Sequence, residues 1–377
     1  MDFNLNEEQQ LLKDSVERFV REDYAFDKRR QLAASEAGYS AANWRKMAEL
    51  GWLGVALPEE YGGIGGGAVE TMVVMEAFGR GLVLEPYFAT VVLGGNAVLL
   101  GASEAAKRAL LPKLVAGELR LAFAHAEPQS RYDLFDVALK ASKTKRGYTL
   151  TGRKGVVLHG GAADKLVVSV RTRGKQRDEA GITLFLVDGR ATGLSRREYP
   201  TVDGLRAAEL GFEGVSVSAD DVLGQVDDGL ALLHRVVDRG IAALAAEAVG
   251  CMQVLHDQTN EYLKTRAQFG QPIGRFQVLQ HRMVDMFMEL EQSRSLCYLA
   301  TLRLGEDAGV AAKACAAAKV QIGRSGRFVG QQAVQLHGGM GMTDELAVGH
   351  YFKRLTMIDV MFGNADYHLK RYARLRA

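Results

Sequence analysis

The sequence has few cysteines and prolines, and its charges almost cancel. Three cysteines among 377 residues, without CxxC spacing, argue against a disulfide framework and indicate buried thiols in a reducing compartment. Six prolines leave most helix interiors uninterrupted. A formal charge of +2 supplies no long-range field that would gather nucleic acid or an anionic membrane. We therefore expect no nucleic-acid partner, and any anionic ligand must be bound by local features.

The chain also lacks a long apolar run and a signal-like start. The longest uncharged segment, residues 86–103, contains a proline, an asparagine and three glycines, which are typical of a soluble buried helix and its ends. The first residues are acidic, without a basic segment followed by an apolar core. These patterns predict a cytoplasmic protein without a membrane span.

What is present is a change of hydrophobic period along the chain. Apolar residues recur at helical spacing in the first third, alternate in the middle third and return to helical spacing in the last third. Long helices are predicted near 229–265, 276–305 and 308–336. The prediction is an α+β fold with an N-terminal helical domain (1–118), a middle β-barrel or sandwich domain (119–225) and a C-terminal four-helix bundle (226–377).

Two helix starts carry explicit capping signals. Asn6 is followed by Gln9 at the spacing of a capping box, which predicts an amphipathic helix over residues 7–21. Ser103 is placed to cap a further helix with an apolar face. Both signals support helical packing in the first third.

Two glycine-containing segments of the last third could bind a phosphate-bearing ligand. Residues 266–281 (RAQFGQPIGRFQVLQH) interrupt a helical pair and then open a helix whose free N–H groups, beside arginines, suit a pyrophosphate. Residues 335–342 (QLHGGMGM) end a helix with glycines that allow close backbone approach, but they follow no strand and so are not a Rossmann fingerprint. From spacing alone, the first segment is equally consistent with a plain helix hairpin whose arginines are solvated.

These two segments, the loop at residues 58–65 and the helix–β–helix order resemble the acyl-CoA dehydrogenase family over essentially the whole chain. The resemblance implies an acyl-CoA dehydrogenase-like fold and the FAD-dependent α,β-dehydrogenation of an acyl-CoA thioester. It also implies an electron-transfer flavoprotein as redox partner. No metal is expected, because the histidines show no ligand spacing.

The resemblance assigns cofactor contacts to both C-terminal segments. Arg266, Gln268 and Phe269 match the family positions that contact the FAD of a neighbouring chain. The helix-end backbone of the second segment matches the position that packs against the adenylate and pyrophosphate of the same cofactor. The residues concerned there are Gln335, Gly338 and Gly339.

In the middle third, the chain departs from the family pattern at the positions that face the flavin. Where the family reads Thr-Glu-Pro-x-x-Gly-Ser-Asp, residues 126–133 read AEPQSRYD, so the threonine becomes Ala126 and the CoA-contacting serine becomes Tyr132. Where the family has Trp-Ile-Thr, the last position, whose threonine bonds the flavin N5 edge, is Leu158. By this resemblance, two hydroxyl groups that hold and tune the isoalloxazine are missing.

Both family positions of the catalytic base are glycine. The reaction needs a base to remove the α-proton while the β-hydride moves to the flavin, and a carboxylate in a dry pocket suits that role. Counted from Arg354, the glutamate of the Tyr-Glu-Gly-Thr motif is replaced by Gly363. Counted back from Gly250, the alternative helix position is Gly240. The backbone N–H of Gly363 could still bond the thioester carbonyl, since the family makes that contact through main chain.

Three carboxylates remain as candidates for a displaced base, and each also has an ordinary structural interpretation. Asp238 suits a surface pair with its neighbour Arg239, and Asp366 suits the cap of the last helix. Glu247 suits a solvent-facing position two turns along the same helix as Asp238. The base is therefore left unassigned.

Some bacterial members of the family are two-gene heterotetramers in which one subunit keeps the base while the other keeps half of the shared site. This chain resembles the second kind. Through residues 154–160 it is similar to the small subunits of bacterial pimeloyl-CoA dehydrogenases, which implies a larger paralogous partner and a dicarboxylic or medium- to long-chain acyl-CoA substrate. Three alternatives stay open: a homo-oligomeric (homotetrameric) dehydrogenase with a displaced base, a non-catalytic FAD-binding scaffold, and a flavin monooxygenase on the same fold.

Overall fold

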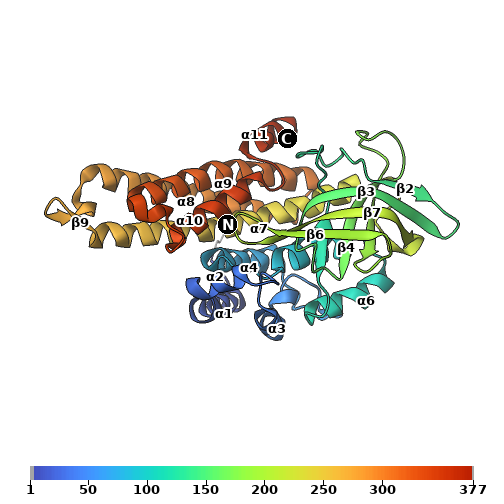
Figure 1. Ribbon diagram of the computed structural model, residues 1–377, viewed down its shortest axis with the longest axis horizontal. Coiled ribbons are helices and arrows are strands. Elements are labelled where there is room, and N and C mark those ends of the chain that lie inside the picture. Colours follow the sequence, from blue (N-terminus) through green and yellow to red (C-terminus); the bar gives the residue numbers. More distant parts are fainter. Residues whose placement is uncertain (1–3, 376–377) are drawn as a thin grey trace. The chain divides into compact units, whose positions relative to one another are not determined.

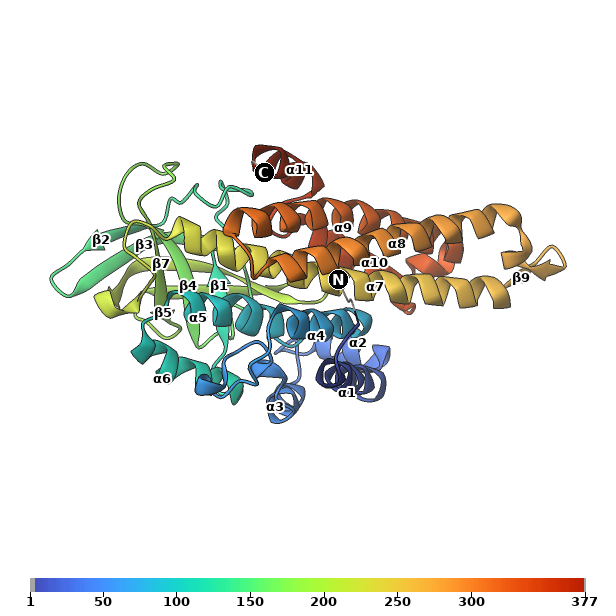
Figure 2. The same ribbon diagram turned by 180° about the vertical axis from the view of Figure 1, so that it is seen from behind.

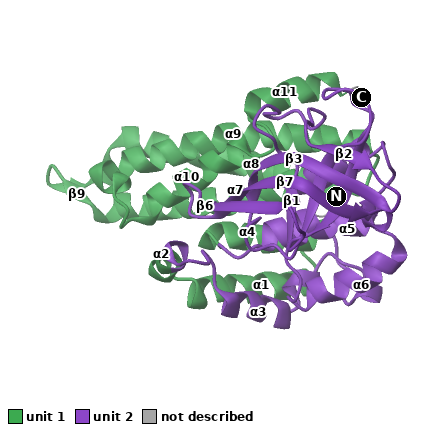
Figure 3. Ribbon diagram, turned by 45° about the vertical axis from the view of Figure 1, so that its right-hand side comes forward, with its two compact units in different colours: residues 1–31, 68–83, 241–377 green, residues 32–67, 84–240 purple. Residues whose placement is uncertain are grey.

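The computed structural model describes residues 4–375. The chain forms two compact units, each built from separate stretches of sequence (Figure 3). One unit consists of residues 1–31, 68–83 and 241–377, and the other of residues 32–67 and 84–240. The predicted α+β class is confirmed. The three-domain division at residues 118 and 225 stays a prediction, because the compact units interleave along the sequence.

The first unit is helical. Three long helices, α7, α8 and α9, lie side by side in both views (Figure 1, Figure 2) and begin and end close to the predicted residues. The predicted capping box of α1 is confirmed, because the Asn6 side chain accepts from the Gln9 N–H while the Gln9 side chain accepts from the Asn6 N–H. The helices are α1 (Glu7–Asp23), α2 (Phe26–Ala34, which continues into the second unit), α4 (Ala68–Gly81), α7 (Leu230–Thr265, which begins in the second unit), α8 (Gln277–Arg303), α9 (Ala308–His337), α10 (Ala347–Val360) and α11 (Ala365–Arg374).

Small residues on α9 allow α10 to approach closely. Gly323, Gly326 and Gly330 share one face of α9 at helical spacing. A Cβ at Gly330 would lie 2.5 Å from the Phe352 ring, and one at Gly323 would lie 2.2 Å from an oxygen of Asp359. The close packing therefore places α10 and the loop that follows it directly against the centre of α9.

The second unit contains an eight-stranded sheet of order β6-β7-β3-β2-β4-β5-β8, with β1 beside β4. Most neighbours are antiparallel, whereas β1 and β2 pair with β4 in parallel. Alternating apolar residues of these strands form a buried core that includes Leu166, Val168, Phe185 and Phe212. The strands are β1 (Leu121–Ala124), β2 (Lys140–Lys143), β3 (Gly147–Leu158), β4 (Lys165–Arg171), β5 (Ile182–Asp188), β6 (Leu194–Pro200), β7 (Arg206–Ser218) and β8 (Val222–Leu223).

The second unit also contains short helices. The prediction that Ser103 caps a helix is confirmed, because its hydroxyl accepts from the Ala106 N–H at 3.3 Å. The uncharged segment noted in the sequence forms a buried π-helix (Phe88–Gly95) followed by α5 (Asn96–Gly101). Among the described residues, no helix is long and apolar enough to span a membrane. Two further α-helices of this unit are α3 (Ala41–Glu49) and α6 (Glu104–Val115).

Candidate functional site

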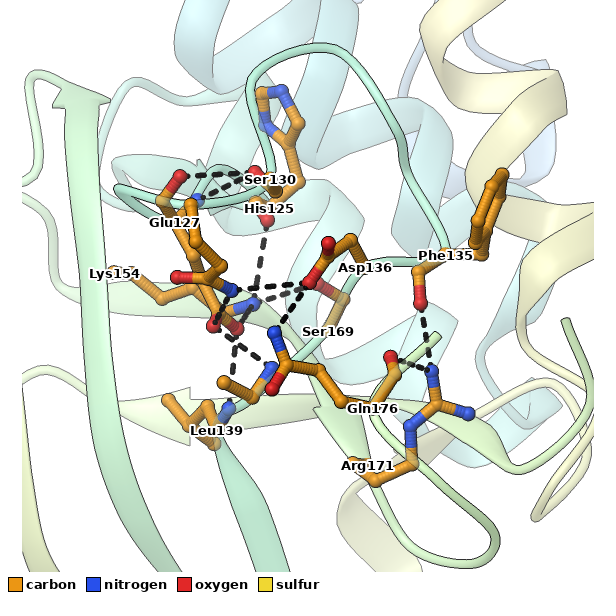
Figure 4. A network of polar contacts seen from close by, with 12 residues as sticks. His125, Glu127, Ser130, Phe135, Asp136, Leu139, Lys154, Ser169, Arg171 and Gln176 are labelled. Atoms are coloured by element: carbon orange, nitrogen blue, oxygen red, sulfur yellow. Dashed lines mark hydrogen bonds and ion pairs between the residues drawn. The ribbon is translucent and has the colours of Figure 1, made fainter. Parts of the chain in front are cut away.

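A buried ion pair joins the two segments of the second unit that carry the predicted flavin-facing positions (Figure 4). The Nζ of Lys154 on β3 lies 2.7 Å from Oε1 of Glu127, and their side chains are 0% and 2% exposed. Lys154 also donates to the Ser169 hydroxyl at 3.0 Å and to the His125 carbonyl oxygen at 3.3 Å. Burial lowers the pKa of Lys154, and the carboxylate of Glu127 opposes that shift. Because an unpaired charge here would be costly, the pair keeps both segments in place.

This anchoring places Ala126 beside the end of β3. The Ala126 carbonyl oxygen accepts from the Gly155 N–H at 2.9 Å. The pairing of β3 with β7 is interrupted between Lys154 and Val157, and Val156 adopts φ 51° at this bulge. Leu158 then pairs with Ala207 at the end of β3. Ala126 is therefore bonded to the strand that ends at Leu158, but neither residue carries a hydroxyl group.

The first predicted cofactor motif forms an exposed hairpin at the end of the long helices (Figure 1). It consists of β9 (Ala267–Gln268), β10 (Gln271–Pro272) and a short 3₁₀ turn (Ile273–Arg275). Arg266 and Gln268 are exposed, and Phe269 is 90% exposed with φ 54°. Such a bulky apolar ring in solvent, held in an uncommon backbone conformation, is typical of a contact with another molecule.

The second motif lies at the same end of the helical unit. His337, the last residue of α9, stacks on Tyr262 near the end of α7 with ring centroids 4.4 Å apart. Gln335, Gly338 and Gly339 are exposed, and a Cβ at either glycine would meet no atom within 4 Å. The structure therefore brings the two predicted motifs together and leaves the backbone at the glycines open to a ligand.

The predicted base position Gly363 lies in a closed loop between α10 and α11. Its φ is 113°, and a Cβ there would lie 2.4 Å from Cδ1 of Tyr367 and 2.9 Å from Nε2 of His368. The Gly363 N–H makes a long hydrogen bond of 3.4 Å to the Val360 carbonyl oxygen. Gly240, the other base position, is buried within α7.

The interpretation of Glu247 as a solvent-facing residue is wrong. Glu247 is 5% exposed and forms a two-point ion pair with Arg354 of α10, with Nε–Oε1 and Nη2–Oε2 distances of 2.6 and 2.7 Å. The Nη1 of Arg354 also lies 3.9 Å from the sulfur of Met361. Both carboxylate oxygens are therefore engaged by the guanidinium, an arrangement that stabilises α7 against α10 and that a proton-abstracting base would have to leave.

The interpretations of the other two carboxylates also need correction. Asp238 is 5% exposed, so it does not belong to a surface pair. The cap of α11 is Asn364 rather than Asp366, because the Asn364 Oδ1 accepts from the Tyr367 N–H at 3.0 Å. Asp366 is exposed in the first turn of that helix, where its negative charge interacts favourably with the helix dipole.

Sequence reasoning missed the residues that hold the Gly363 loop. Lys319 of α9 is completely buried and donates to two carbonyl oxygens of the loop region, and His368 bonds a third. The one local signal for Lys319 was a lysine on the otherwise apolar, alanine-rich face of α9. The described residues contain no group of three potential metal ligands. The prediction of buried thiols is confirmed, because Cys251, Cys297 and Cys315 are buried.

Comparison with known proteins agrees with this architecture. Residues 6–118, 122–215 and 227–375 match the family models for the N-terminal, middle and C-terminal domains of acyl-CoA dehydrogenase. The chain is 31% identical to a mitochondrial isovaleryl-CoA dehydrogenase of Solanum tuberosum, over 95% of this chain and 88% of that protein.

Solved structures share the fold over nearly the full length. The ChsE4–ChsE5 complex of Mycobacterium tuberculosis gives a TM-score of 0.90 at 28% identity, covering 99% of this chain and 98% of the matched chain. The FAD complex of PigA gives a TM-score of 0.90 at 27% identity, with coverages of 99% and 98%. The chain therefore belongs to the acyl-CoA dehydrogenase family of FAD-dependent oxidoreductases.

Proposed function

We propose that this chain is the base-deficient subunit of a two-chain acyl-CoA dehydrogenase. In such a complex the partner subunit supplies the carboxylate that removes the α-proton, and this chain supplies cofactor contacts across the interface. The observation that carries the proposal is the Gly363 loop, where Tyr367 and His368 enclose the glycine at the position that the family resemblance predicts for the base. When bound, FAD accepts the hydride that leaves the β-carbon of the acyl chain.

The exposed end of the helical unit fits the adenylate and pyrophosphate half of FAD. Arg266 is exposed beside the hairpin, and a guanidinium forms strong charge-assisted bonds with phosphate oxygens. Gly338 and Gly339 leave their backbone open to close approach. By contrast, Ala126 and Leu158 offer no hydroxyl to the flavin ring. This imbalance supports a chain that contributes half of a shared cofactor site.

The partner and the substrate follow from the same reasoning. The similarity to a chain of the ChsE4–ChsE5 complex supports an assembly of two different chains, a heterotetramer with a larger paralogous subunit. The resemblance at residues 154–160 supports pimeloyl-CoA, or another dicarboxylic or medium- to long-chain acyl-CoA, as substrate. An electron-transfer flavoprotein would reoxidise the flavin in the cytoplasm.

The test is an anaerobic titration of the purified chain with a panel of acyl-CoAs that includes pimeloyl-CoA. FAD per protomer is measured first, and the flavin absorbance is followed during the titration. We expect sub-stoichiometric FAD and no bleaching for the chain alone, and full bleaching after co-expression with the acyl-CoA dehydrogenase chain that co-purifies with it. The same titration of the complex ranks the acyl chains.

Three outcomes would contradict the proposal. Stoichiometric FAD and full bleaching by a homo-oligomer, abolished by Asp238→Asn or Glu247→Gln with the fold intact, would show a displaced base in this chain. Bound FAD that no acyl-CoA reduces, with or without a partner, would instead show a non-catalytic scaffold. If the complex consumes oxygen with an aromatic substrate and a reductase, the chain belongs to a monooxygenase.

A further inference from the structure

One buried lysine holds the loop between α10 and α11 from the side of α9. The Nζ of Lys319 donates to the carbonyl oxygens of Asp359 and Gly363, each at 2.7 Å. The carboxylate of Asp359 extends this contact, because Oδ1 accepts from the Ala365 N–H at 3.2 Å and Oδ2 accepts from Arg327 at 2.9 Å. The two ends of the loop are therefore bonded to the same lysine.

A second side chain holds the loop from α11. The Nε2 of His368 lies 2.9 Å from the Phe362 carbonyl oxygen. Burial, with the nearby ammonium of Lys319, lowers the pKa of His368 to about 3, so the ring is neutral and carries its proton on Nε2. Phe362 and Gly363 have φ of 58° and 113°. A bulky residue such as Phe362 keeps a positive φ only where the surroundings impose that conformation.

In this conformation, the space for a side chain at residue 363 is occupied. The rings of Tyr367 and His368 fill it, at 2.4 and 2.9 Å from an ideal Cβ. The His368 ring is held by its bond to Phe362, and the Tyr367 ring packs edge-on against it with ring centroids 5.2 Å apart. A carboxylate introduced here would have to displace α11, or change the loop conformation and break the hydrogen bonds from Lys319.

We propose that Lys319 and His368 are positioning residues that clamp residues 361–364 in a form that closes the base position. The loop conformation of this subunit then excludes a base, and a glutamate introduced at residue 363 does not act as one. The inference rests on the proposed function and goes beyond it, since a subunit could lack its base and still keep an open site.

The first test is Gly363→Glu in the purified chain loaded with FAD, with Gly305→Glu as a matched control at an exposed glycine where a Cβ would meet no atom within 4 Å. We expect Gly363→Glu to lower the Tm and to give no bleaching by acyl-CoA above the unmodified chain, while the control keeps its Tm. A Gly363→Glu chain with unchanged Tm that acyl-CoA bleaches would overturn the inference. Bleaching of the unmodified chain would instead overturn the proposed function.

The second test measures the clamp itself by hydrogen–deuterium exchange of the peptide covering residues 360–366. Lys319→Met removes both donated hydrogen bonds, whereas Arg324→Met removes an exposed cation from the same helix. We expect exchange in this peptide to rise about tenfold in Lys319→Met, while exchange is unchanged in Arg324→Met. Unchanged exchange in Lys319→Met would overturn the clamp.

If Lys319→Met does not fold, His368 supplies an independent pair of variants. His368→Gln keeps an N–H donor near the Phe362 carbonyl, whereas His368→Phe keeps a ring and removes the donor. We expect His368→Gln to preserve the protection of residues 360–366 and His368→Phe to reduce it. A purely space-filling role predicts the reverse order, and that result would also overturn the inference.

Discussion

Glycine has opposite roles in two regions of the helical unit. At the end of α9, Gly338 and Gly339 face open space and leave their backbone accessible. In the loop after α10, Gly363 is enclosed by two rings and has a backbone conformation that other residues rarely adopt. The first pair is suited to receive a ligand, whereas the second excludes a side chain. An intact motif and a lost motif therefore differ in geometry as well as in residue identity.

The comparison extends to the charged groups of the two regions. Arg266 is exposed beside the hairpin, whereas Arg354, Glu247 and Lys319 near the loop are buried and bonded within the chain. Charges at the hairpin end can be used by a ligand, and those around the loop serve the fold. Four experiments can break or sharpen this contrast.

The largest expected effect is the loss of stability in Glu247→Ala. The variant leaves Arg354 buried without its carboxylate, which typically costs about 3–5 kcal/mol of unfolding free energy. Glu261→Ala, which removes an exposed partner of Lys264 on the same helix, should cost less than about 1 kcal/mol. Denaturant unfolding measures both. A stable Glu247→Ala chain that loses flavin reduction would identify Glu247 as a base.

Gly363→Ala should destabilise the chain by about 2–4 kcal/mol, because backbone strain and overpacking add. The matched change Gly339→Ala meets no neighbour and should stay within about 0.5 kcal/mol. Thermal and denaturant unfolding of the two variants test the contrast directly. Equal costs at the two positions would show that the loop is not closed.

Lys319 predicts a pH dependence of stability. Burial lowers its pKa from 10.5 to about 7 in the folded chain, despite the nearby Asp359 carboxylate, with neutral His368 and the paired Arg327 beside it. Between these values the unfolded chain binds more protons, so stability rises with pH. The unfolding free energy of the unmodified chain minus that of Lys319→Met should therefore increase by about 2–3 kcal/mol between about pH 7 and pH 9. A constant difference would contradict a shifted lysine.

The smallest effect concerns cofactor affinity rather than folding. In the two-chain complex, Arg266→Ala should weaken FAD binding about 10- to 100-fold, because one charge-assisted bond is lost, while the unfolding of this chain is unchanged. Flavin fluorescence titration gives the Kd. Arg303→Ala, at the other end of α8 and paired with Glu306, is the control and should leave the Kd unaltered. Unchanged FAD affinity in Arg266→Ala would show that Arg266 of the hairpin does not bind the cofactor.

Much of the local structure could be predicted from the sequence. The three long helices, the capping box at Asn6 and the cap at Ser103 appear where the patterns placed them. Helical periodicity and caps depend on residues three or four positions apart, so a single sequence contains the necessary information. The residues of the two predicted cofactor motifs and the glycine at residue 363 could also be identified in the sequence, although their geometry could not.

The sequence by itself determined the helical and strand-rich segments, the two glycine-containing motifs and the glycine at each position where the family resemblance predicts the base. Only the tertiary structure decided that Glu247 is neutralised by Arg354, 107 residues away, and that Lys319 holds a loop more than 40 residues further along. A buried charge requires a partner, but the partner is selected by the packing of separate helices. Periodicity shows which face of a helix is buried, and only the folded chain shows what that face meets.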